Sequence, residues 1–180
     1  ATNESSEAVW PVTFYGLDPN AKYTFNGLSD GYGQNDLYAD ADGRVCLWLP
    51  DDSYSITVTG EDGTHKGFKA TVDGAAAVAS EVALYGFTVN GTDIAFRSGD
   101  GWTYNGRMRI NLTGDVDSYE LNGILTNVCV MVDCDCSITL SNATMRTWGL
   151  GVPPGVLYVH GTDNVSLHLA GDNEITSGEG

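Results

Sequence analysis

Two pairs of aspartates are the first residues of this 180-residue chain whose spacing could support chemistry. Asp115 and Asp117, and likewise Asp133 and Asp135, stand two residues apart, so an extended backbone points both carboxylates of a pair to one side. Paired carboxylates can cleave glycosidic bonds or bind calcium through their oxygens. Aspartate is also common in turns for backbone hydrogen bonding alone. We therefore expect structural turns, with calcium bound by Asp133 and Asp135 as the alternative, and the turn DADG at 40–43 allows the same two interpretations.

Three of the four cysteines lie in the stretch VCVMVDCDC. A zinc site would need C-x-x-C spacing and further Cys or His ligands nearby, which argues against a metal here. Cys134 and Cys136 would point to one side of an extended strand but lie too far apart to bridge. We expect free or core thiols, with a disulfide from Cys129 to Cys134 or Cys136 as the alternative.

The basic residues argue against an enzyme. The second half of the chain contains no lysine and four arginines, Arg97, Arg107, Arg109 and Arg146. The three histidines fall in different predicted strands, and no serine stands in a nucleophile-elbow context. We expect a binding protein, and a polysaccharide lyase or hydrolase is the minority alternative.

Charge and hydropathy limit the partners. The chain carries 24 acidic residues against 8 lysines and arginines, for a formal net charge of -16. A chain without a basic stripe cannot neutralise phosphates, which argues against nucleic acid and anionic membranes. No apolar run approaches the length of a membrane span, so we expect a soluble chain with no direct membrane insertion.

The elements that must position these residues are strands. Short alternating runs such as YTFNG and YSITVTG recur between Gly, Asp and Asn turns, and no segment has a convincing helical pattern. The spacing of hairpin-sized strands predicts an antiparallel β-sandwich over 8–92. A repeat follows over 93–180, which predicts a short parallel β-helix of about three coils. The expected fold class is therefore all-β.

The repeat has a step of 28 and then 29 residues. It aligns three apolar pairs, Ile110 with Leu112, Ile138 with Leu140, and Leu167 with Leu169. If each coil stacks on its neighbour, the first members form one inward column and the second members another. The valines of VCVMV are expected to be inward positions of one coil.

Aromatic residues are concentrated in the repeat half. Flat rings beside carboxylates and amides suit the stacking and hydrogen bonding of sugar rings. The candidate ligand-binding residues are Trp102, Tyr104, Trp148 and Tyr158. Trp102, at the entry to the first coil, is also the best candidate for a cap on the core. The loop RTWGLGVPPGVLY cannot continue a ladder, so we expect it to project and to expose Trp148.

The segments GWTYNGRMRINLTGDVDSYELNG, NVCVMVDCDCSITLSNATM and GVLYVHGTDNVSLHLAGDNEITSG resemble β-helix repeats of secreted and wall-attached, adhesin-like proteins of Gram-positive bacteria. The earlier stretches VTFYGLDPNAKYTFNG and ADADGRVCLWLPDDSYSITVTG resemble transthyretin-like or immunoglobulin-like modules of bacterial surface proteins. The resemblance implies an extracellular or cell-surface location. It also implies that the β-helix half binds a polysaccharide or a host or cell-surface glycan and that the sandwich half is a spacer. The alternative partner is a surface protein, bound by a structural adhesin without sugar binding.

Overall fold

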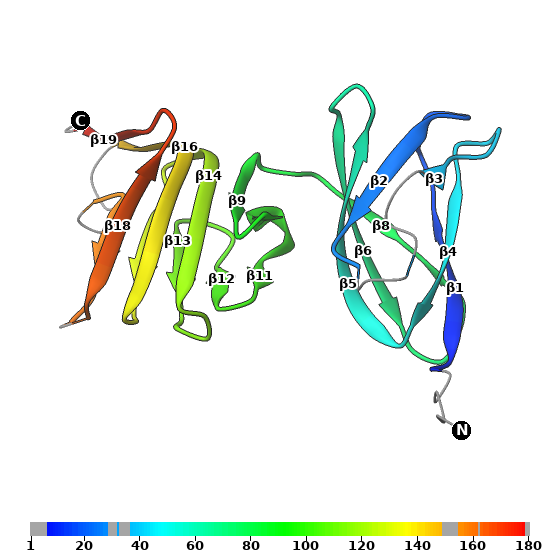
Figure 1. Cartoon of the computed structure of the whole chain (residues 1–180), viewed down its shortest axis with the longest axis horizontal. Helices are drawn as coiled ribbons and strands as arrows, with labels where there is room; N and C mark the ends of the chain where they lie inside the picture. The colour runs from blue at the N-terminus through cyan, green and yellow to red at the C-terminus, as the bar shows by residue number, and fades with distance from the viewer. Residues whose placement is uncertain (1–6, 29–31, 33–36, 149–154, 162, 179–180) are drawn as a thin grey trace. The chain divides into compact units, whose positions relative to one another are not determined.

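The computed structural model describes residues 7–28, 32, 37–148, 155–161 and 163–178 (Figure 1). Strands dominate this part of the chain, and its one helical element is the three-residue 3-10 helix η1 (Ile94–Phe96). The protein is therefore all-β, which confirms the predicted fold class at that level. The chain forms two compact units, unit 1 (Ala1–Leu84) and unit 2 (Tyr85–Gly180), each with its own apolar core.

The boundary between the units lies before residue 85, whereas the sequence predicts it between 92 and 93. The difference comes from β9 (Phe87–Val89), which pairs antiparallel with β14 (Ser118–Thr126). Phe87 and Val89 are fully buried in the core of unit 2. The segment that looks like the last strand of the first half therefore belongs to the second.

Unit 1 contains two sheets. The sheet with order β4-β1-β7 is formed by β1 (Val9–Phe14), β4 (Val45–Pro50) and β7 (Ala77–Val78). The sheet with order β3-β2-β5-β6-β8 is formed by β2 (Lys22–Asn26), β3 (Leu37–Tyr38), β5 (Asp52–Gly60), β6 (His65–Val72) and β8 (Ser80–Val82). All pairings within the described residues are antiparallel except that of β1 with β7.

Both sheets of unit 1 contribute to one core. Alternation along each strand sends every second side chain inward, as in the buried–exposed pattern of β4. Phe14 of β1 contacts two rings of the other sheet edge to face, with centroid distances of 5.0 Å to Phe25 and 5.4 Å to Phe68. Such contacts add to the burial of apolar area and fix how the rings pack.

Unit 2 also contains two sheets. One has the order β10-β9-β14-β16-β18, with β19 also paired to β16, and its further strands are β10 (Thr92–Asp93), β16 (Cys136–Trp148), β18 (Val165–Ala170) and β19 (Glu174–Gly178). The other has the order β11-β12-β13-β15-β17 and is formed by β11 (Ser98–Gly99), β12 (Trp102–Tyr104), β13 (Arg109–Leu112), β15 (Cys129–Val132) and β17 (Leu157–Val159).

Parallel pairing dominates the later strands of unit 2. β14, β16 and β18 run side by side in one direction (Figure 1), and β13, β15 and β17 do so in the other sheet. Residues paired across neighbouring strands form rows. Apolar rows from both sheets join in one core, which includes Ile110 and Val130 of one sheet and Leu121 and Leu140 of the other.

The predicted columns are half right. Ile138 pairs with Leu167 and Leu140 with Leu169, which is the expected 29-residue step, but Leu167 and Leu169 are exposed and not inward as predicted. Ile110, however, pairs with Val130 in the other sheet, and the residue before Ile138 in its row is Tyr119. The step from Tyr119 in β14 to Ile138 in β16 is thus 19 residues, whereas the predicted step to Ile138 was 28. The expectation that Val128, Val130 and Val132 point inward agrees with their burial.

Candidate functional site

The four aromatic residues predicted to bind ligand do not share one surface. Trp102 is 1% exposed and Tyr104 is 9% exposed, because alternation along β12 sends both side chains into the core. Trp102 therefore offers no free ring face for stacking, and its burial agrees with its expected role as a cap. The assignment of Tyr104 to ligand binding stays a prediction. Trp148 is 62% exposed, and Tyr158 is half-buried.

Trp148 is the last residue of β16 and lies on the outer face of its sheet. Ala143, Met145 and Thr147 are buried, so the alternate residues Thr144, Arg146 and Trp148 point outward. Residues 149–154 of the loop that was predicted to project lie outside the described residues. The exposure of Trp148 therefore follows from the alternation of β16.

A polar group of side chains accompanies Trp148 on this face. We call Thr126, Arg146, Trp148, Glu174 and Thr176 the Trp148 strip. Thr126, Arg146 and Thr176 form one row across three strands. The Arg146 guanidinium donates to both Glu174 carboxylate oxygens, at 3.3 Å from Nε and 2.8 Å from Nη2. Arg146 and the hydroxyl of Thr176 together hold the pKa of Glu174 below its ordinary value.

The backbone amide of Trp148 is held by a hydrogen bond, while its ring is exposed. The Trp148 amide donates to the Asn127 side-chain oxygen at 3.1 Å, which orients the end of β16. Gly178 is paired opposite Trp148 and has no side chain to cover the indole. A Cβ placed on Gly178 would approach only the Thr147 carbonyl, at 3.7 Å, so this position could accept a side chain without a backbone clash. The indole face is therefore available to a flat, apolar ligand surface.

A hollow of about 460 Å³ adjoins the same face. Its lining includes Ile124 and Thr126, which are exposed residues of β14, together with the rings of Tyr85 and Tyr104. These two rings meet edge to face with centroids 6.1 Å apart, and the Arg97 guanidinium carbon lies 5.2 Å from the centroid of Tyr104. Tyr85 is 50% exposed, so it is the accessible ring of the pair. Sequence reasoning missed this hollow because Tyr85 lies outside the repeat.

Tyr158 belongs to a different surface of unit 2. It pairs with Met131, which pairs with Asn111, on the sheet that does not contain Trp148. Its ring lies 6.3 Å from that of His160, and His160 Nδ1 lies 3.3 Å from Asp133 Oδ1. Tyr158 and Trp148 therefore cannot stack on one sugar residue.

Three of the four paired aspartates contact other residues through their side chains. Asp133 faces His160, and Asp135 accepts a hydrogen bond from the Asn164 amide at 2.6 Å. Thr113 donates to Asp115 at 3.0 Å. Across residues 7–28, 32, 37–148, 155–161 and 163–178, no three His, Cys, Asp or Glu side chains are placed to hold a metal ion. Calcium at Asp133 and Asp135 thus stays a prediction. The Thr113–Asp115 contact is local, as expected of a structural turn, whereas Asp133 and Asp135 contact residues of a later segment.

The DADG turn is closed by a guanidinium. Arg44 contacts Asp40 at 3.0 Å and Asp42 at 2.7 Å, so a protein cation occupies the place considered for calcium. Backbone hydrogen bonding from Arg44 is the largest cause that lowers the pKa of Asp40. This turn is therefore organised by charge pairing within the chain.

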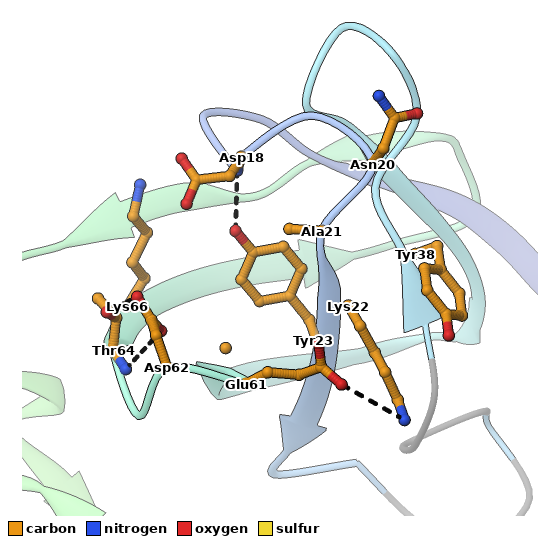
Figure 2. A pocket seen from close by; sticks show the side chains of 11 residues that line it. Asp18, Asn20, Ala21, Lys22, Tyr23, Tyr38, Glu61, Asp62, Thr64 and Lys66 are labelled. Atoms are coloured by element: carbon orange, nitrogen blue, oxygen red, sulfur yellow. Dashed lines mark hydrogen bonds and ion pairs between the residues drawn. The ribbon is translucent and has the colours of Figure 1, made fainter.

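Unit 1 has a polar hollow of about 300 Å³ beside the turn at 60–64 (Figure 2). Figure 2 shows the Lys22 ammonium directed toward Glu61, 3.8 Å away, and Asp62 turned toward Thr64. The Tyr23 hydroxyl accepts a hydrogen bond from the Asp18 amide at 2.8 Å. These polar groups bond to one another across the hollow. The sequence indicated only a turn here, because residues from β2 and the β5–β6 hairpin meet only after folding.

Comparison with protein families, with curated proteins and with solved structures finds no match to this chain. Among the described residues, no helix is long and apolar enough to cross a membrane.

Proposed function

We propose that the protein is a secreted or wall-attached bacterial surface protein whose unit 2 binds carbohydrate and whose unit 1 acts as a spacer. The observation that carries the proposal is the exposed Trp148 ring beside the Arg146–Glu174 pair on one sheet face. Sugar rings present apolar C–H faces and a rim of hydroxyls. The exposed indole can stack on the C–H face of a sugar, while the charged and hydroxyl side chains of the Trp148 strip can hydrogen-bond its hydroxyls.

The proposed architecture is a short parallel β-helix in unit 2 and an antiparallel β-sandwich in unit 1. The parallel pairings of β14, β16 and β18, and of β13, β15 and β17, support the first. Both sheets of unit 1 contribute residues to one core, which supports the antiparallel β-sandwich. A β-helix holds its outer residues in rows at strand spacing, about 4.8 Å, which is close to the length of one sugar unit in a chain.

The ligand we favour is a polymer that extends beyond one sugar. The hollow at Tyr85 shares Thr126 with the Trp148 strip, so a chain crossing β14 and β16 would meet an aromatic ring at each end. A neutral glycan is favoured over an anionic one. The charge of Arg146 is matched by Glu174, and the chain as a whole carries a formal charge of -16.

Affinity electrophoresis through gels containing β-glucan, mannan, xylan or hyaluronan would test the proposal, with and without calcium. We expect retardation by at least one neutral polysaccharide and none by hyaluronan. Trp148→Ala should weaken that binding roughly tenfold, about 1.4 kcal/mol, while the melting temperature hardly changes. Trp48→Ala is the matched control, because Trp48 is 60% exposed in unit 1.

Two results would contradict the proposal. If Trp48→Ala lowered binding as much as Trp148→Ala, the Trp148 strip would not be the ligand site. If Trp148→Ala caused a large fall in melting temperature, Trp148 would be a structural residue, and its role in sugar stacking would be withdrawn. Release of reducing sugar ends during incubation would instead favour the hydrolase or lyase alternative.

A second candidate function, protein binding, is favoured by one observation. Apolar side chains are exposed on the last strands of unit 2, namely Val159, Leu167, Leu169 and Ile175. Such a group of aliphatic side chains is typical of a surface that contacts protein. Leu169→Lys should abolish binding of this kind and leave polysaccharide retardation intact, which separates the two functions.

A further inference from the structure

The corner between β15 and β16 brings two cysteines together. Residues 134 and 135 form a bend, and Cys136 opens β16. The expectation that Cys134 and Cys136 lie too far apart to bridge assumes an extended backbone, and the bend removes that assumption. Across the bend, the Cys134 side chain is one of the causes, after burial, that raise the pKa of Cys136.

The surroundings fix the positions of both cysteines. Cys134 packs against the core of unit 2, and Cys136 is 9% exposed. The Tyr119 hydroxyl donates to the Gly101 carbonyl at 2.8 Å and accepts from the Gly114 amide at 3.1 Å. Gly114 leaves room for Cys134, since a Cβ there would lie 2.7 Å from the Cys134 Cβ.

We propose that Cys134 and Cys136 are a dithiol site that closes reversibly into a disulfide by exchange with a low-molecular-weight disulfide. The Cys134 thiolate attacks one sulfur of the small disulfide, which forms a mixed disulfide and releases the first small thiolate. The Cys136 thiolate then attacks the Cys134 sulfur and releases the second. The two cysteines lose two electrons and two protons, and the small disulfide gains them as two thiols.

The order of attack follows from exposure and burial. Cys134 is the more accessible thiol of the pair. Burial is the largest cause that raises the pKa of Cys136, to about 12, so its thiolate is scarce at neutral pH. Cys134 therefore reacts first, and Cys136 resolves the mixed disulfide from its position two residues away across the bend. A disulfide across a single intervening residue is geometrically constrained, and constrained disulfides are readily reduced.

The other cysteines supply controls. Cys129 is fully buried in β15, so it should stay unmodified while the protein is folded. Cys46 is exposed in unit 1 and would form its own mixed disulfide, so the test is run on the full chain carrying Cys46→Ser. Because Cys46 lies on the surface, replacing it with serine should not impair folding.

The test incubates this chain with oxidised glutathione, blocks remaining thiols with an alkylating agent and measures intact and peptide masses. We expect the loss of two hydrogens and the loss of alkylation at Cys134 and Cys136 together, both restored by a reducing agent. Adding Cys136→Ser should trap glutathione on Cys134, and adding Cys134→Ser should leave Cys136 unreacted.

Three outcomes would overturn the proposal. Lasting glutathionylation of Cys134 in the chain that retains Cys136 would show that Cys136 does not resolve it. Full alkylation of both cysteines after oxidation would show that neither reacts. A disulfide that includes Cys129 would replace this pair with the alternative considered from the sequence. The central measurement uses the chain with both cysteines in place, so it does not depend on whether either additional variant folds.

Discussion

The two units bury their apolar residues in different ways. In unit 1, strands of both sheets supply a core whose central rings, Phe14, Phe25 and Phe68, are at most 1% exposed. In unit 2, burial changes along a single row. Leu121 and Leu140 are fully buried, while Leu169 in the same row is 68% exposed. In this row a leucine is buried where a strand stacks on each side of it and exposed where the row ends.

This difference shows that an apolar pattern alone does not fix the energetic role of a residue. A core shared by antiparallel sheets depends on contacts in many directions, so the alternation of each strand predicts burial directly. A stack of parallel strands depends on nearest neighbours, so the same alternation has different consequences at different positions in the stack. The comparison can be tested by substitutions matched in chemistry and different in position.

The largest effect is expected for Phe14→Ala in unit 1. Removing a fully buried ring that contacts two others should lower the free energy of unfolding of unit 1 by about 3–5 kcal/mol. Because the two cores share no residue, unit 2 should keep its stability. Hydrogen exchange measured by mass spectrometry should show lost protection in peptides of unit 1 only. Equal loss in both units would mean that they unfold as one cooperative body.

The next effect compares Leu140→Ala with Leu169→Ala, which remove the same atoms from one row. Leu140→Ala should lower the free energy of unfolding of unit 2 by about 2–5 kcal/mol, because it leaves a cavity in a closed part of the core. Leu169→Ala should change it by no more than about 0.5 kcal/mol. Urea unfolding followed by circular dichroism measures both. Similar losses for the two variants would show that Leu169 is covered in solution.

The row positions explain how far the sequence could predict the fold. Alternation predicted the strands and the parallel stacking of Ile138 on Leu167, because both segments repeat the same pattern with similar lengths between them. It could not reveal that Tyr119, in a segment of different composition, precedes Ile138 in the same row. Rows depend on how many residues each turn contains. The motif INL at 110–112 resembles ITL at 138–140 although the two strands lie in different sheets.

The candidate site shows a similar limit. Exposure of Trp148 was predicted from its loop, yet it follows from alternation in a strand whose end the sequence did not locate. The sequence does not reveal whether Trp102 and Tyr104 are buried or exposed, because aromatic side chains suit both a core and a sugar site. The ion pair of Arg146 with Glu174 joins residues 28 positions apart and depends on the pairing of β16 with β19.

The smallest effect compares the exposed ion pairs of the two units. Arg146 lowers the pKa of Glu174 mainly through a side-chain hydrogen bond, whereas the backbone of Arg44 is the main cause that lowers the pKa of Asp40. Arg146→Met removes the main cause for Glu174, and Arg44→Met leaves the backbone amide that acts on Asp40. We therefore expect the Glu174 midpoint to rise in Arg146→Met, while the Thr176 hydroxyl still lowers it, and the Asp40 midpoint to rise less in Arg44→Met.

Carboxyl carbon chemical shifts recorded across a pH titration measure both midpoints. A lowered folded pKa means that the stabilisation by Glu174 is present above about pH 4.5 and is lost as the pH falls through the folded pKa. The acid limb of the stability curve should therefore flatten slightly in Arg146→Met and less in Arg44→Met. The effect is small because both carboxylates are exposed and solvent screens them. An Asp40 midpoint that rises fully to the ordinary aspartate value would show that the arginine side chain governs both ion pairs alike.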